Sequence, residues 1–411
     1  METSSGTVRD RVSVTAWIMS AVFALAAFAP GHASRTGAFV AVAVILFQLA
    51  QGKKLDRLDG LAAAFITWLL VGSFFTEPTD ASGDLFRDLV AGALIFTAIR
   101  LSVDSRRSAN VVGGGLVLGC AYMALNLVPQ VGDRPISQLE LASDTLRYTF
   151  EGLNSNHVAY SVASACFVLL AVVIDDQSRG KFVKCVTFAM GAALFYFGVL
   201  PPGTRGGLIA TVGMAALIPL VRLFGGKATK LRLRLFAALV LLASVGLSAG
   251  LLERLIQGRL AVSDREDGTL NGRLEMWPRA LASIRESPIF GKGPGASLDI
   301  NNGISFHNAL LDITVDLGLI GVSIWTALIV LSLRALQGNS SRIRLSMVAG
   351  TLLLTVILLS GYWHPSPTLW AVVGFMTTLG PGGRAFPSER QEEEHVPTAD
   401  ERVSSVRRRR Y

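Results

Sequence analysis

The chain has 411 residues, of which 51% are hydrophobic and only 17% are charged. Soluble domains are usually about 25% charged, so this composition argues against an ordinary soluble protein and for a surface that largely faces lipid. The net charge of +8 is compatible with nucleic-acid binding, but the positions of the positive charges, given below, fit membrane orientation better. Cys120, Cys166 and Cys185 lie in or beside apolar runs without paired or metal-like spacing, which argues against a disulfide framework or a metal cluster.

Twelve segments predict an all-α polytopic membrane protein, because a helix needs about 20 mainly apolar residues to cross the hydrocarbon core. Their approximate bounds are 12–30, 37–51, 60–76, 86–103, 109–129, 157–175, 182–200, 206–224, 233–252, 309–333, 345–363 and 367–382. The second and the last are the shortest. The first follows an acid-containing N-terminus and has no convincing cleavage site after it, so we interpret it as a span and not as a signal peptide.

Lys and Arg residues concentrate on one side of the predicted membrane. With the N-terminus in the cytoplasm, the cytoplasmic segments hold 26 of the 38 Lys and Arg residues, as the positive-inside rule requires. An even number of spans also places the C-terminus there. Residues 1–383 then form the transmembrane domain, with a long, partly helical extracytoplasmic loop at about 252–308. Residues 384–411 are expected to be a disordered basic cytoplasmic tail that contacts anionic lipids, and nucleic acid is not an expected partner.

The long outer loop contains many charged residues but has no net charge. Between Leu252 and Asn308 it has seven basic and seven acidic residues, which indicates specifically placed charges, with a solvated surface of weak ion pairs as the alternative. Apolar residues three and four apart in Asn271–Ser287 predict an amphipathic helix at the headgroup level, kinked near Pro278. The glycines of Ser287–Ala296 lack the Walker spacing of a nucleotide loop, so they predict a tight turn beside a ligand or a helix.

Two other outer segments are short and polar. One is PPGTRGG, Pro201–Gly207, in which Arg205 lies at the start of a predicted span. An arginine there can simply extend its charge to water. However, Gly206 and Gly207 leave room for a large anion, and a helix N-terminus offers donors to phosphate, so both interpretations stay open. The other segment, about 129–156, ends in GLNSNHVAY.

A histidine and an asparagine precede the tenth predicted span. His307 is the only histidine of the long loop, and although a lone histidine is more often structural, this position faces the outside and suits a proton acceptor. Asn308 is expected to cap the helix that follows. His157 occupies a similar position at the start of the sixth span. His364, in WHPSP, is expected to be structural in a tight outer turn.

These segments, in this order, resemble the motifs of the O-antigen ligase and polymerase superfamily. The resemblance is carried by GTRGGLIATVG, by NGRLEMWPRALASIRESPIFGKGPG and by FHNALLDITVDLGLIG, with GLNSNHVAY upstream, and it is strongest between about 152 and 321. It implies a GT-C-type membrane fold and a metal-independent, cofactor-free glycosyltransferase of the outer face of the bacterial cytoplasmic membrane. The implied donor is a glycan on undecaprenyl diphosphate, and the implied acceptor is another glycan or lipid A-core.

The resemblance also implies roles for individual residues. Arg205 and Arg273 would bind the donor diphosphate, and His307 would assist the acceptor hydroxyl with Asn308 beside it. Family members often have Glu where this chain has Asp316, which speaks against a catalytic role for that shorter carboxylate. The remaining candidates for substrate binding are Asn154, Asn156, Gly206, Gly207 and Arg279.

The chemistry agrees with this resemblance. A diphosphate is a good leaving group, and arginine forks stabilise the charge that develops on it, so no ATP is needed. Direct displacement would invert the anomeric configuration. One alternative is a flippase or other transporter of the same lipid, but transporters concentrate charges and broken helices at the membrane midplane and often contain repeats. A scaffold or a peptidoglycan-type glycosyltransferase is a third possibility, against which the combination of GTRGG and HN argues.

Overall fold

The computed structural model describes residues 12–74, 80–133, 150, 153–175, 181–202, 204–224, 273–336 and 341–380. All secondary structure in these residues is helical, which confirms the predicted all-α class. The elements of the first half are α1 (Val14–Phe28), α2 (Pro30–His32), the π-helix η1 (Ala33–Gly37), α3 (Ala38–Ala50), α4 (Arg57–Ser73), α5 (Asp80–Ser102), α6 (Arg106–Asp133) and α8 (Ser155–Asp175). Those of the second half are α9 (Lys181–Leu194), the π-helix η2 (Phe195–Val199), α10 (Arg205–Phe224), α12 (Arg273–Glu286), α13 (Ala296–Ile300), α14 (Ala309–Ala335), α15 (Ser341–Ser360) and α16 (Pro367–Thr378).

The predicted spans coincide with helices wherever the structure describes them, and only 233–252 lies outside the described residues. Four helical stretches in the described part are long and apolar enough to cross a membrane. They are Pro30–Ala50, Arg106–Val128, Phe182–Val199 and Ala309–Ala335. Val14–Phe28, Ser155–Ala171, Gly206–Ala216 and Ser346–Ser360 are shorter apolar helices. The polytopic class is therefore confirmed, and the number of twelve spans stays a prediction.

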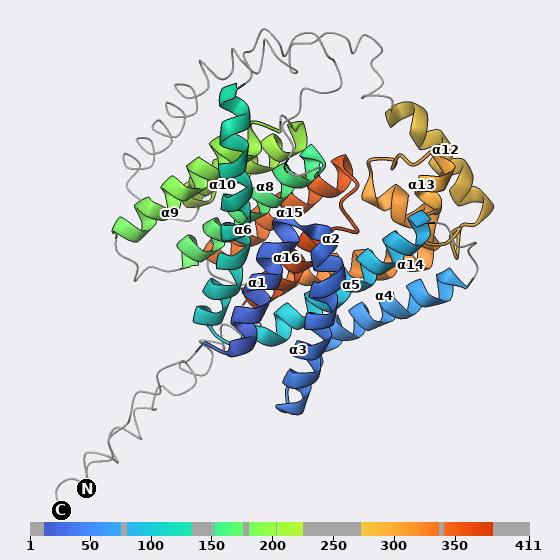
Figure 1. The fold of residues 1–411 in the computed structure, drawn as a ribbon, viewed down its shortest axis with the longest axis horizontal. Helices are drawn as coiled ribbons and strands as arrows, with labels where there is room; N and C mark the ends of the chain where they lie inside the picture. The colour runs from blue at the N-terminus through green and yellow to red at the C-terminus, as the bar shows by residue number, and fades with distance from the viewer. Residues whose placement is uncertain are drawn as a thin grey trace, which may run out of the picture.

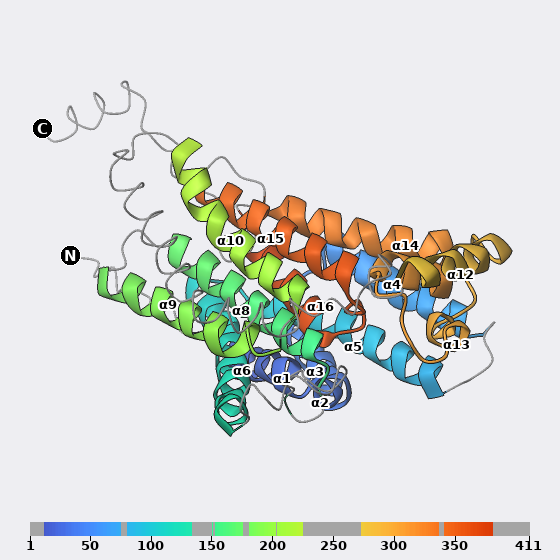
Figure 2. The same ribbon diagram turned by 90° about the horizontal axis from the view of Figure 1, so that it is seen from above.

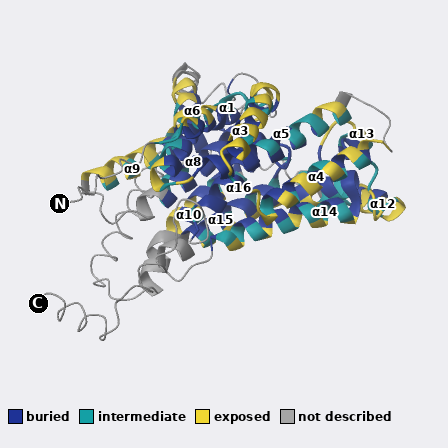
Figure 3. Ribbon diagram, turned by 90° about the horizontal axis from the view of Figure 1, so that it is seen from below, coloured by how far each residue is buried: buried dark blue, intermediate teal, exposed yellow. Residues whose placement is uncertain are grey.

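The helices form an elongated bundle with its most buried helix inside. Every residue of α16 is buried, and Figures 1 and 2 show this helix within the bundle, while Figure 3 shows exposed residues along α4, α6 and α9. Large apolar side chains on the outer helices are unusually accessible, including Phe39 at 80% and Phe182 at 80%. Apolar exposure on this scale is what contact with lipid requires.

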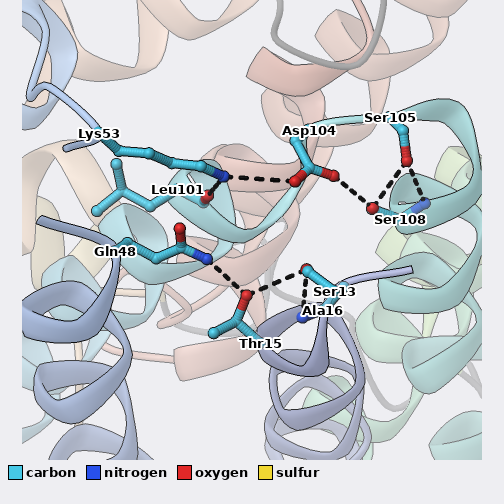
Figure 4. Close-up of polar contacts among 9 residues, drawn as sticks. All are labelled: Ser13, Thr15, Ala16, Gln48, Lys53, Leu101, Asp104, Ser105 and Ser108. Atoms are coloured by element: carbon cyan, nitrogen blue, oxygen red, sulfur yellow. Dashed lines mark hydrogen bonds and ion pairs between the residues drawn. The ribbon is translucent and has the colours of Figure 1, made fainter. Parts of the chain in front are cut away.

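Polar side chains join several helix ends at one end of the bundle (Figure 4). The Gln48 amide donates to Thr15 Oγ1 at 2.6 Å, which links the end of α3 to the start of α1. The Lys53 ammonium donates to the Leu101 carbonyl at 2.7 Å, so that the segment after α3 is tied to the end of α5. Helix ends that the charge pattern assigns to the cytoplasm therefore lie together.

A buried ion pair connects α4 and α5 at the same end. Arg100 Nε donates to Asp59 Oδ1 at 2.9 Å, and the same guanidinium pairs with Asp56. Near the other end of α1, the Ala26 carbonyl accepts from Thr368 at 2.6 Å. This alternation of helix ends agrees with the predicted topology, while the side of the membrane stays a prediction.

The helix predicted within the long loop is confirmed, but its buried face is rotated relative to the predicted one. The amphipathic helix predicted within Asn271–Ser287 is α12, and Pro278 lies inside it. Its buried face includes Ala280, which packs with Phe306 and Val315 in a second apolar core, separate from the main one. Leu281, predicted to lie on the apolar face, is 49% exposed, because Ala280 is the residue that points to that core.

The long helix α14 is broken at Gly318, whose φ of 67° and ψ of −170° are not helical. The carbonyl groups released by the break accept other donors: Asp316 O from Gly293 N at 2.7 Å, and Leu317 O from the Trp68 indole at 2.9 Å. The Leu319 amide donates to the Pro288 carbonyl at 2.8 Å. Backbone groups in an apolar environment need such partners, so the segment 288–293 fills the break.

The glycine-rich turn therefore lies beside a helix, which was one of its two predicted settings. Gly291, Gly293 and Gly295 all have positive φ values, of 75°, 97° and 91°. A methyl group on Gly291 would lie 2.5 Å from the carbonyl oxygen of Asp316 and 2.5 Å from the nitrogen of Gly318. The turn and helix α14 can approach each other this closely only because the residues at the crossing, Gly291 and Gly318, are both glycines.

Candidate active site

His307 lies in a short loop before α14 and has an unusual backbone conformation. Its φ of 54° is in the left-handed region, which costs about 1–2 kcal/mol for a residue with a Cβ. Its amide donates to Ser305 Oγ at 3.3 Å, and the residue is half-buried. Strained backbone at a non-glycine residue persists only when its surroundings fix it, and such residues gather at functional sites.

Asn308 is the N-cap of α14, as predicted. Its side-chain Oδ1 accepts from the amide of Leu310 at 3.1 Å and from the amide of Leu311 at 3.3 Å. The carboxamide thereby satisfies two of the amides that have no partner within a helix. The cap also fixes the residue next to His307 relative to the helix axis.

Two buried carboxylates on the first turns of α14 each hold a different loop. Asp316 accepts from the Ser297 amide at 2.7 Å through Oδ1, and from the Ser297 hydroxyl at 3.1 Å through Oδ2. This use of both oxygens gives Asp316 a structural task at the start of α13. One turn earlier, Asp312 Oδ1 accepts from the Phe306 amide at 2.9 Å. The sequence analysis gave Asp312 no role, although an acid inside an apolar run is a signal in itself.

The start of α10 packs tightly against two other helices. A methyl group on Gly206 would lie 2.5 Å from the Tyr160 hydroxyl and 2.7 Å from the Ser360 hydroxyl, and one on Gly207 would lie 2.7 Å from Ala159 Cβ. The space beside these glycines is therefore filled by α8 and α15. Close helix packing explains both glycines, and their predicted role beside a bound anion stays a prediction.

Gly206→Ala is expected to lower the free energy of unfolding by about 1–3 kcal/mol, the usual cost of overpacking. Gly191→Ala is the matched control, because it is also a helical glycine but has no atom within 4 Å of the added methyl group. Thermal unfolding of the purified proteins in detergent compares the two. Equal stability of both variants would contradict the tight packing at Gly206.

The turn between α15 and α16 packs against α8. The Trp363 ring lies 5.6 Å from the ring of Tyr160. In the same turn, the Tyr362 ring lies 4.8 Å from the ring of His364. Figures 1 and 2 show this turn between the α8–α10 pair and the α12–α13 pair.

His364, in the same turn, is completely buried. Neither of its ring nitrogens has a hydrogen-bond partner among the residues that the structure describes, while its carbonyl accepts from the Trp370 indole at 2.8 Å. Burial lowers the pKa of the His364 imidazole from 6.5 to about 3. The ring is therefore neutral at physiological pH, which agrees with a structural role.

This histidine is expected to make the fold sensitive to acid. Below pH 6.5 the unfolded chain binds a proton that the buried His364 ring, with its pKa near 3, does not accept. Stability then falls by up to about 1.4 kcal/mol per pH unit as the pH decreases through this window. His364→Phe should flatten the dependence of Tm on pH between 7 and 5, whereas the exposed control His32→Phe should not. An equal dependence of Tm on pH in the wild type and in His364→Phe would refute the proposed contribution of His364 to acid sensitivity.

The polar residues at the start of the sixth predicted span and just before it make structural hydrogen bonds. His157 Nε2 lies 2.9 Å from the Ala27 carbonyl, which links α8 to α1. Asn154 Oδ1 accepts from the Asn156 amide at 2.8 Å just before α8 begins. The predicted substrate contacts of Asn154 and Asn156 stay predictions.

The three predicted arginines are placed only in part. Arg205 is the first residue of α10, where backbone amides favour anions, and Arg273 belongs to α12, as the first residue that the structure describes after 224. Their side chains lie outside the described part of the structure. Arg279, on α12, is exposed. Within the described ranges, no group of three or more His, Cys, Asp or Glu side chains is arranged to hold a metal ion.

The segment from α9 to the middle of α14 has known relatives. Residues 188–326 match the family model described as O-antigen ligase. This segment is therefore similar to the O-antigen ligase family. The match confirms the family predicted from the sequence, and it spans about a third of the 411 residues. Curated proteins compared with the chain gave no match.

The matched segment includes Arg205, Arg273 and His307, while the elements up to α8 and the helices α15 and α16 lie outside it. The family supports glycan transfer of the ligase or polymerase type, by a glycosyltransferase that acts on lipid-linked glycans in a membrane. Together with the apolar helices it indicates an integral protein of the bacterial inner membrane.

Proposed function

We propose that this protein transfers a glycan from undecaprenyl diphosphate to a sugar hydroxyl at the outer face of the cytoplasmic membrane, as an O-antigen ligase or polysaccharide polymerase. The observation that carries the proposal is the position of His307. It lies within the matched domain, in a left-handed conformation that neighbouring groups fix, directly before the cap of α14. An ionisable ring held in this way suits proton transfer.

The proposed reaction is a direct displacement at the anomeric carbon. His307 takes the proton from the acceptor hydroxyl, whose oxygen forms the new bond to the anomeric carbon. The bond from that carbon to the diphosphate oxygen breaks, and the electron pair leaves with undecaprenyl diphosphate. Arg205 and Arg273 hold the diphosphate and stabilise its growing charge. The anomeric configuration inverts, and the step requires neither a metal nor ATP.

The proposed topology places this reaction on the extracytoplasmic face of the membrane. Both termini are cytoplasmic, the tail 384–411 contacts anionic lipid headgroups, and the acceptor is a glycan chain or lipid A-core. The excess of Lys and Arg in one set of loops supports this orientation. The polar contacts that join helix ends of this set agree with their placement on one common side.

One observation favours a transporter as the second candidate, because broken helices are common in transporters. The break at Gly318 in α14 is such a feature. However, the backbone of the segment 288–293 forms hydrogen bonds with the backbone groups released by the break, whereas a transport site would leave these groups free to bind the ligand. The break therefore serves to pack this loop against α14, and an enzyme explains the structure better than a transporter does.

Reconstitution into liposomes with a purified lipid-linked glycan distinguishes these candidates, with no nucleotide present. A longer glycan on the same lipid identifies a polymerase, and glycan on a lipid A-core acceptor identifies a ligase. Movement of the lipid across the bilayer without a new glycosidic bond would identify a transporter and overturn the proposal.

A further inference from the structure

Phe306, the residue before His307, is held at both of its backbone polar groups. Its amide donates to Asp312 Oδ1 at 2.9 Å, and its carbonyl accepts from the Trp277 indole at 3.1 Å. The side chain is completely buried. Two residues from different helices, Trp277 on α12 and Asp312 on α14, thus fix the two peptide groups on either side of the Phe306 Cα.

The surroundings of Phe306 are built from the same two helices and from α13. Phe306 packs with Ala280 of α12, Val315 of α14 and Ala296 of α13 in the second apolar core. Upstream, the buried Asn301 amide donates to the Ile304 carbonyl at 2.9 Å and lies 3.0 Å from the sulfur of Met276 on α12. The loop 301–308 is therefore attached to α12 at two adjacent positions.

The conformation of His307 depends on this attachment. Its φ of 54° is unfavourable for a residue with a Cβ, and its neighbour on the other side, Asn308, is fixed by the helix cap. Phe306 and Asn308 together hold the backbone of His307, from which the ring projects. Release of Phe306 would let the backbone relax toward common φ values, and the ring would move with it.

We infer that Trp277 and Asp312 are positioning residues that clamp Phe306 and so fix the His307 ring. The catalytic consequence rests on the proposed function, whereas the positional one does not. Because Arg273 is one helical turn before Trp277 on α12, the clamp also couples the proposed diphosphate site to the proposed proton acceptor. A shift of α12 on donor binding would then reach His307 through the Trp277 indole.

Histidine modification tests the clamp without any assay of transfer. Diethyl pyrocarbonate acylates accessible neutral imidazoles, and peptide mass spectrometry gives the rate at each histidine, with the exposed His32 as internal reference. Trp277→Phe and Asp312→Ala should each change the rate at His307 by about fivefold, the effect of one ordinary hydrogen bond. The rate at His32 should stay constant.

Two control variants separate the clamp from general loosening. Asp312→Asn keeps an oxygen acceptor for the Phe306 amide, so its His307 rate should stay near that of the wild type. Trp325→Phe removes a buried indole whose nitrogen has no hydrogen-bond partner in the described part of the chain, and it should leave the rate unchanged. Wild-type rates in Trp277→Phe and Asp312→Ala, or equal changes in the controls, would overturn the inference.

Kinetics then test the catalytic consequence in the full-length enzyme. Trp277→Phe and Asp312→Ala should lower kcat by about 10–100-fold, the cost of a slightly misplaced catalytic group, with KM for the lipid donor unchanged and activity restored in Asp312→Asn. A wild type without transfer activity would refute the proposed function and leave the modification result valid. A raised KM with unchanged kcat would refute positioning and leave the proposed function intact.

Discussion

His307→Ala is expected to reduce glycan transfer by about 10²–10⁴-fold, the contribution of a positioned general base. The physical reason is that the acceptor hydroxyl keeps its proton at neutral pH and attacks poorly without a group that removes it. The measurement is the initial rate of transfer in proteoliposomes, at saturating donor and acceptor.

Two controls accompany this prediction. The folded state of the His307→Ala variant is checked by its Tm, which should stay close to that of the wild type because the ring is only half-buried. His32→Ala removes an exposed histidine on a different part of the chain and should transfer glycan at the normal rate. Normal transfer by the His307 variant would exclude the proton-acceptor role.

Gly318→Ala is expected to lower the free energy of unfolding by about 2–6 kcal/mol. Two costs combine: about 1–3 kcal/mol for a Cβ at this combination of φ and ψ, which is almost exclusive to glycine, and about 1–3 kcal/mol for overpacking. The added methyl group would collide with the Ile289 carbonyl and lie 2.5 Å from the Gly291 nitrogen. Thermal or denaturant unfolding in detergent gives the value.

Gly303→Ala is the matched control for this substitution. Gly303 also has a positive φ, of 80°, but no atom lies within 4 Å of a methyl group added there. It should show the conformational cost alone, so Gly318→Ala should be less stable than Gly303→Ala. Equal stability of the two variants would mean that the segment 288–293 does not fill the break in α14.

The sequence predicted the helices well because their signal is local. Long apolar runs define most spans, and the Asn308 cap and the amphipathic α12 depend on residues only a few positions apart. Leu281 shows the limit of this reasoning: its spacing fits the apolar face, yet Ala280 is buried and Leu281 is exposed. The contacts that α12 makes with Phe306 and Val315 decide its rotation, and helical periodicity alone cannot predict them.

The remote contacts of the site could not be predicted. The Trp68 indole donates to the Leu317 carbonyl across 249 positions of the chain, and Tyr160 meets Ser360 across 200 positions. Such pairs follow from the packing of distant helices. The glycines Gly206 and Gly318 were visible in the sequence, but only the structure shows which neighbour each one accommodates.

The most direct test of glycan transfer is the stoichiometry of undecaprenyl diphosphate release. Proteoliposomes receive purified lipid-linked glycan and acceptor, without nucleotides, and both released lipid diphosphate and new glycosidic bonds are quantified. The proposed mechanism predicts one undecaprenyl diphosphate per new bond in the wild type, and a strong loss of both products in Arg205→Ala and Arg273→Ala. Glycan that crosses the bilayer while its diphosphate linkage stays intact would contradict the mechanism.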